Sequence, residues 1–176
     1  MAATARKIRV VGDPVLRAHC PAVTNFDADL AQLIEDMTAS MHAADGVGLA
    51  APQIGVELAV FVYDCPDASG ERHRGHLVNP VLISRSTEID DNEEGCLSVP
   101  GPYESLPRAA VATVSGVDRH GGPTEVTGTG FFARCLQHET EHLSGVLFID
   151  HLPRNRRRRV LREMAPFDWN APAPSS

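Results

Sequence analysis

Two stretches of the chain space their apolar side chains three and four residues apart, as one face of an α-helix does. In the first stretch these positions are Leu30, Leu33, Ile34, Met37 and Met41. Asp27 is suited to cap the start of this helix, and Asp45-Gly46 to follow its end. The second stretch covers residues 131–143. We therefore expect one helix near the N-terminus and another in the last third of the chain.

Other stretches are rich in β-branched and apolar residues and are bounded by turn-forming residues, which predicts strands. They are residues 7–11, 58–63, 76–84, 109–118 and 124–129. The second and third would form a hairpin with a long polar tip, and the last two an antiparallel pair. The glycine-rich segment 46–55 holds a single polar side chain, Gln53. Such a segment can line a cleft, although a plain connecting loop is an equally simple interpretation.

The C-terminal part is dominated by arginine. Six arginines follow Pro153, at positions Arg154, Arg156, Arg157, Arg158, Arg159 and Arg162. Their spacing fits first a solvated helix that packs through one narrow apolar stripe, and an electrostatic contact with RNA or an acidic surface is the alternative.

Together these patterns predict an α+β fold. Antiparallel strands and short sheets would pack around a central helix bearing residues 137–142, with a further N-terminal helix and a C-terminal helix. A chain of 176 residues and 19.0 kDa is the size of one domain. We expect a single catalytic domain over residues 1–170 and a frayed tail over 171–176.

The composition excludes several classes of protein. Hydrophobic residues make up 43% and charged residues 22%, as in ordinary folded proteins. A net charge of −7 argues against a protein built to bind specific DNA. No apolar run has the length of a signal peptide core or a membrane span. We therefore expect a cytoplasmic protein without a membrane partner.

The sequence His138-Glu139-Thr140-Glu141-His142 carries the chemistry that can be recognised most directly. On a helix, histidines four residues apart project from the same face and can bind one metal ion. Glu139 would lie close enough to the open coordination position to move protons without being a ligand. Two ordinary surface histidines are the alternative.

A catalytic metal usually has three protein ligands and one open position for water. Asp150, His151 and Glu163 lie downstream of the two histidines, and the sequence excludes none of them. Cys96, in a presumed loop between Gly95 and Pro100, is the better candidate because a soft thiolate with two imidazoles suits Fe²⁺, Zn²⁺, Co²⁺ or Ni²⁺.

Three segments, taken in order, make the chain similar to the peptide deformylase family. They are Gly46-Val47-Gly48-Leu49-Ala50-Ala51-Pro52-Gln53, Glu94-Gly95-Cys96-Leu97-Ser98 and Gln137-His138-Glu139-Thr140-Glu141-His142. The resemblance extends over nearly the whole chain, and the three segments together are far more specific than any one alone.

The resemblance implies roles for individual residues. The implied metal ligands are Cys96, His138 and His142. Glu139 would be the general acid and base, while Gln53 and the backbone N–H of Leu97 would flank the formyl carbonyl. These residues would form the catalytic centre.

Further residues are implied to contact the substrate. The backbone of Gly48 would pair with the peptide, and Val47, Arg134 and Cys135 would surround the methionine side chain. Glu141 stands where the family usually has aspartate, so the expected buried ion pair, with Arg108 or another arginine, would be formed here by a different carboxylate side chain.

The resemblance thus predicts a metal-dependent hydrolase that removes the N-formyl group from the N-terminal methionine of new polypeptides and releases formate. It would use one divalent ion, with Fe²⁺ expected before Zn²⁺, Ni²⁺ or Co²⁺. The alternatives are a metallopeptidase that cuts internal bonds and a non-enzymatic module with four protein ligands around a structural metal. The expected substrate also makes the ribosome a candidate partner of the arginine-rich segment.

Overall fold

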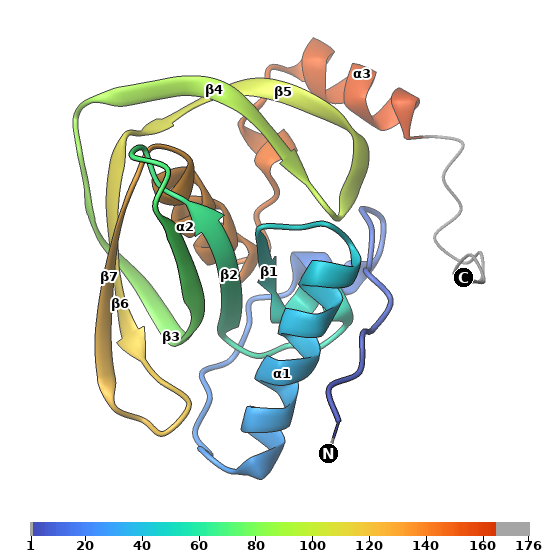
Figure 1. The fold of residues 1–176 in the computed structure, drawn as a ribbon. Helices are drawn as coiled ribbons and strands as arrows, with labels where there is room; N and C mark the ends of the chain where they lie inside the picture. Colours follow the sequence, from blue (N-terminus) through green and yellow to red (C-terminus); the bar gives the residue numbers. More distant parts are fainter. Residues whose placement is uncertain (1, 165–176) are drawn as a thin grey trace.

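A computed structural model of the protein describes residues 2–164 and has an α+β fold (Figure 1). The helices of this part of the chain are α1 (Ala28–Ala43), α2 (Gly130–His142) and α3 (Arg154–Glu163). Its strands are β1 (Gly48–Ala50), β2 (Val60–Pro66), β3 (Arg72–Arg85), β4 (Ile89–Cys96), β5 (Val99–Ala109), β6 (Val111–Val117) and β7 (Pro123–Thr129). Short 3₁₀ turns cover Pro14–Arg17, Ala51–Ile54 and Phe148–His151. The predicted tail 171–176 lies outside the described residues.

The strands form two antiparallel sheets. The larger has five strands in the order β1-β2-β3-β6-β7, and the smaller is the hairpin of β4 and β5 (Figure 1). Strand β2 is buried on both faces: Val60 and Val62 join the apolar cluster of α1, whereas Phe61 and Cys65 join that of α2. Since neighbouring side chains of a strand point to opposite faces, α1 and α2 cover opposite faces of the sheet at β2.

The predicted helices and strand pairs are largely confirmed. Helix α1 begins where expected, because an Asp27 carboxylate oxygen accepts the backbone N–H groups of Asp29 and Leu30. The β2–β3 and β6–β7 pairs are antiparallel, although the first has a shorter tip than predicted. The expected C-terminal helix is present as α3, whose Val160 is buried. In the described part of the chain, no helix is both long and apolar enough to span a bilayer.

The strand predicted at residues 7–11 is wrong. The Arg9 N–H donates to the Gln53 carbonyl at 2.7 Å, and the Val11 N–H donates to the Ser98 carbonyl at 2.8 Å. These acceptors belong to two different segments, so no continuous ladder forms and the stretch is not a strand. Instead it ties the Gln53 and Ser98 segments together.

The prediction that Cys96 lies in a loop is also wrong, because Cys96 belongs to the β4–β5 hairpin. Cys96 is the last residue of β4 and lies opposite Val99 of β5. The buried face of this hairpin contains Glu94, Glu104 and Arg108. Charged residues at buried positions concealed the usual alternation of apolar and polar residues, so the pattern did not predict a strand.

Candidate active site

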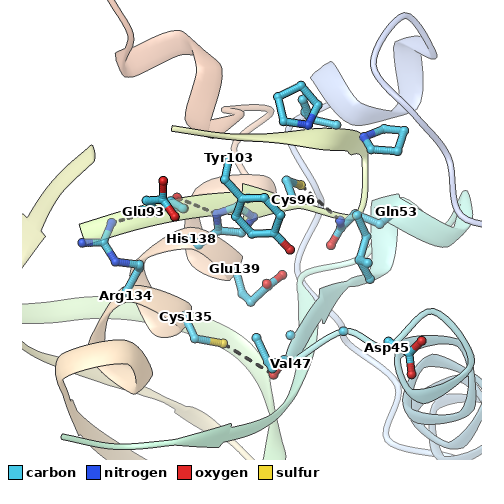
Figure 2. Close-up of a pocket in the computed structure, with 18 of the residues that line it drawn as sticks. Asp45, Val47, Gln53, Glu93, Cys96, Tyr103, Arg134, Cys135, His138 and Glu139 are labelled. Carbon is cyan, nitrogen blue, oxygen red and sulfur yellow. Dashed lines mark hydrogen bonds and ion pairs between the residues drawn. The ribbon is translucent and has the colours of Figure 1, made fainter. Parts of the chain in front are cut away.

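Helix α2 and the end of β4 bring three possible metal ligands together, Cys96, His138 and His142, of which Figure 2 shows Cys96 and His138. The Nε2 atoms of His138 and His142 are 3.0 Å apart, and the Cys96 Sγ is 3.3 Å from the His142 Nε2. The three ligand atoms all lie within 4.8 Å of one another. A spacing of four residues puts both histidines on one face of α2, and the hairpin supplies the sulfur from a distant part of the chain.

His138 is oriented by a buried carboxylate. Its Nδ1 lies 2.6 Å from Glu94, which also accepts hydrogen bonds from Arg108 at 2.7 and 2.9 Å and from Arg134 at 2.9 Å. Although burial raises it, hydrogen bonds from Arg108 and His138 hold the pKa of Glu94 well below its usual range. An ionised Glu94 fixes the Nδ1 proton of His138 and leaves the Nε2 lone pair directed at the cluster.

Arg108 connects this carboxylate to a second one. It donates to the two carboxylate oxygens of Glu141 at 2.7 and 3.0 Å. The ion pair expected between Glu141 and Arg108 is therefore present, with the glutamate partly exposed. A guanidinium shared by two carboxylates locks the hairpin against α2.

The three ligand atoms suit a divalent cation. One sulfur and two imidazole nitrogens are a common donor set for first-row metals. Although burial opposes it, Cys96 and Glu94 raise the pKa of His138 well above its ordinary value, whereas burial and His138 lower that of His142. The residues around the three atoms therefore favour one positive charge at this place and disfavour protonation of both imidazoles. This is expected where a metal cation binds in place of the protons.

Glu139 is buried beside the ligand atoms and is not itself among them. Its Oε2 has no hydrogen-bond partner in residues 2–164. Burial raises the pKa of Glu139 to about 7, while His138 opposes the rise and Glu94 adds to it. Gly48 makes room for this carboxylate, because a Cβ at that position would overlap it and approach the Cys135 Sγ to 2.8 Å. An unpartnered, buried carboxyl group is available to exchange a proton.

Gln53 faces the cluster from the opposite side. Its Oε1 accepts the Ala50 N–H at 2.9 Å, and its Nε2 donates to the Ser98 hydroxyl at 3.1 Å and lies 3.6 Å from the Cys96 Sγ. These bonds fix the amide so that its N–H group points towards Cys96, as Figure 2 shows. Gln53 can therefore present a donor to a molecule bound at the cluster.

A cavity of about 370 Å³ opens onto these groups. The predicted site residues that line it are Val47, Gly48, Gln53, Cys96, Leu97, Arg134, Cys135, His138 and Glu139. The remaining one, His142, is in contact with Cys96 and His138. Arg134 is only 2% exposed, and its guanidinium is bonded to Glu94 and to backbone carbonyls.

The downstream candidates for a third ligand lie elsewhere. Asp150 binds Arg17 and Arg157, and His151 is 2.9 Å from Glu141. The sequence predicted no role for three further residues of the site: Glu94, which orients His138, Ser98, which accepts a hydrogen bond from Gln53, and Tyr103, which lines the cavity. A glutamate two positions before the cysteine was the one available signal for Glu94.

Comparisons with known proteins identify the family of this chain. Residues 5–158 match the family model described as polypeptide deformylase. Peptide deformylase 1 of Streptomyces avermitilis is 54% identical over 165 residues, which cover 92% of this chain and 76% of that protein. Peptide deformylase 2 of Streptomyces coelicolor is 49% identical over 165 residues, which cover 94% of this chain and 92% of that protein.

Solved structures give the same result. A peptide deformylase from Legionella pneumophila is 44% identical with a TM-score of 0.85, covering 93% of this chain and 95% of that one. The peptide deformylase of Ehrlichia chaffeensis in complex with actinonin is 32% identical with a TM-score of 0.87, covering 93% and 97%. From the family match and these identities, the chain belongs to the polypeptide deformylase family.

Proposed function

We propose that this protein is a metal-dependent hydrolase that removes the formyl group from the N-terminal methionine of new polypeptides and releases formate. The observation that carries the proposal is the meeting of Cys96, His138 and His142 beside the buried, unpartnered carboxyl group of Glu139. We assign the whole activity to one catalytic domain, residues 1–170.

Cys96, His138 and His142 are the proposed ligands of one divalent metal ion. A divalent ion held by such residues lowers the pKa of a bound water to near neutrality and polarises a carbonyl group. The soft sulfur and the two imidazoles suit Fe²⁺, which we propose as the native ion, and also Zn²⁺, Ni²⁺ or Co²⁺.

Glu139 is the proposed general base and acid. Its buried Oε2 has no partner in residues 2–164, so it is free to accept the proton of the attacking water. The same oxygen then delivers this proton to the leaving nitrogen, which departs as the new amino terminus. One carboxyl group can serve both steps because the water and the nitrogen react at the same carbon.

Gln53 and the backbone N–H of Leu97 are proposed to stabilise the negative oxygen that develops on the formyl carbonyl. We expect Gln53→Leu to lower kcat by about 10²- to 10³-fold, because one donor of this kind is lost. Steady-state formate release measures the effect. Full metal content in the variant would show that the donor alone is missing, and an unchanged rate would show that Gln53 only packs.

The substrate peptide is proposed to bind along β1. This strand is at one end of the strand order of the larger sheet, so one of its sides has no neighbouring strand, and Gly48 lies in the cavity wall. An edge strand offers free backbone groups to an extended peptide. Val47, Arg134 and Cys135 line the same cavity, and we propose that they surround the methionine side chain.

We expect Glu94→Gln to weaken metal binding by about 10- to 100-fold, as is typical when the partner of a ligating histidine is changed. The neutral amide removes the charge that fixes the Nδ1 proton of His138. It also leaves the positive charges of Arg108 and Arg134 less well balanced. Competition with a chelator measures the affinity. Glu93→Gln, on the exposed face of the same strand, is the matched control.

The direct test of the function is formate release from a formyl-Met peptide by protein loaded anaerobically with Fe²⁺ or Ni²⁺. We expect release that depends on the metal, and no cleavage of the same peptide without its formyl group. No release at full metal occupancy would overturn the proposal. Cleavage of an internal peptide bond would favour a metallopeptidase instead.

We also propose a transient contact with the ribosome in the cytoplasm. Arg156 and Arg159 bind Glu104, and Arg157 binds Asp150. The exposed arginines of α3 that form no ion pair within residues 2–164 are Arg154, Arg158 and Arg162. Their spacing of four residues aligns them on one face of the helix, which suits a phosphate backbone.

Replacing these three arginines with glutamine should reduce cosedimentation with ribosomes and leave turnover of a short formylated peptide unchanged. Arg85→Gln, at the exposed end of β3, is the control for loss of a surface charge. If the triple variant cosedimented with ribosomes as the wild type does, the proposed ribosome contact would be wrong.

A further inference from the structure

The exposed face of the β4–β5 hairpin places an acidic residue next to an aromatic one. Glu93 of β4 lies opposite Ser105 of β5. Tyr103 comes two residues before Ser105 and points to the same face, so it is a diagonal neighbour of Glu93. Diagonal neighbours of this kind are within reach of long and aromatic side chains. Tyr103 is 69% exposed, and its ring rests over Gly95, where a Cβ would meet Cδ1 at 2.7 Å.

This pair belongs to the rim of the catalytic cavity. Glu93, Gly95 and Tyr103 line the cavity that also contains Cys96 and Glu139. Figure 2 shows the Tyr103 side chain hanging from its strand across the space in front of His138, with its hydroxyl group towards the interior. A peptide whose first residue reaches the ligand atoms must therefore pass this ring.

The free charges of the rim are negative. Glu93 and Asp45 are exposed cavity residues, and neither side chain has a hydrogen bond or ion pair within residues 2–164. The arginine of the cavity wall, Arg134, is 2% exposed and bound to Glu94. The rim therefore offers two free carboxylates, and the lining residues within 2–164 offer no free cation to a bound peptide.

We propose that Tyr103 and Glu93 recognise a lysine or arginine side chain at the residue that directly follows the formylated methionine. A cation is attracted to the face of an aromatic ring, and the carboxylate beside the ring attracts the same charge. An acidic side chain at this place is repelled by Glu93. The inference rests on the proposed function and adds the class of polypeptide that is processed fastest.

Three peptides that differ only in the second residue test the proposal: formyl-Met-Lys, formyl-Met-Gln and formyl-Met-Glu, each followed by the same neutral residues. We expect kcat/KM to fall from lysine to glutamine to glutamate by about two- to fivefold at each step, as is typical of partly exposed ion pairs and cation–π contacts. The lysine-to-glutamate ratio should shrink in 0.5 M salt, because ions screen exposed charges.

Variants of Glu93 and Tyr103 test whether these two residues cause the preference for a cationic second residue. Glu93→Gln should reduce the lysine-to-glutamate ratio about two- to fivefold, and Tyr103→Leu, which keeps apolar bulk without the ring, should reduce the lysine-to-glutamine ratio. Glu125→Gln is the matched control, because Glu125 is an exposed carboxylate on β7, at the opposite edge of the sheet from β1. It should leave both ratios unchanged.

Equal kcat/KM for the three peptides in the wild type would overturn the inference while leaving the proposed function intact. Wild-type ratios that persist in Glu93→Gln would assign the preference to other residues and would also overturn it. Glu93 is exposed, so this variant should fold even if Tyr103→Leu does not. Absence of formate release from all three peptides would instead overturn the proposed function, and this inference with it.

Discussion

Glu139→Gln should retain its metal and lose about 10²- to 10⁴-fold in kcat, the range typical of general acid–base catalysis. Glutamine fits the same buried space beside Gly48, so the geometry of Cys96, His138 and His142 is kept. It cannot take up the proton of the attacking water or return one to the leaving nitrogen. Formate release and metal content, measured on the same sample, separate the two effects.

The surface variant Glu125→Gln is the control for this comparison and should have wild-type kcat. Near-normal turnover of Glu139→Gln with the metal in place would disprove the proton-transfer role. Loss of the metal together with activity would mean instead that the carboxylate supports the ligands, because Glu139 lies beside His138 in the chain.

Cys96→Ala should lose most of its bound metal and, with it, formate release. Two imidazoles remain, and a catalytic site of this type normally needs three protein ligands. Metal that binds only the folded state stabilises it, so the Tm of the wild type should fall on chelation. The Tm of Cys96→Ala should respond far less, and elemental analysis of the purified proteins gives the metal content.

Cys20→Ala removes a thiol that is buried in an apolar cluster and does not line the cavity. This control should keep its metal and its response to chelation, whatever it loses in stability. If Cys96→Ala held metal as tightly as Cys20→Ala does, Cys96 would not be a ligand and an acidic residue would have to replace it.

Hydrophobic periodicity predicted the helices and strands whose buried face is apolar. The repeat from Leu30 to Met41 gave α1, and the runs that became β2, β3, β6 and β7 gave two antiparallel pairs. These patterns can be read locally because each element buries one stripe or one face of its own side chains. The motif at residues 138–142 was placed on a helix for the same reason.

The β4–β5 hairpin was missed because its buried positions are charged. Glu94 is stabilised by Arg108 and Arg134, which lie 14 and 40 positions further along the chain. A carboxylate is buried only where such partners surround it, and no local sequence pattern predicts partners that lie far away in the chain. The strand predicted at residues 7–11 rested on local alternation, whereas the backbone N–H groups of Arg9 and Val11 bond to two separate segments.

The sequence by itself determined the three short motifs in which the proposed metal-binding and catalytic residues stand: Cys96, His138, Glu139 and His142, together with Gln53. The tertiary structure decided how they meet, because ligand atoms more than 40 positions apart are brought together by the packing of β4 against α2. It also decided the surroundings of the site. Glu94 behind His138 and Tyr103 beside Glu93 follow from the register of one hairpin, and register depends on long-range pairing that single-sequence patterns do not encode.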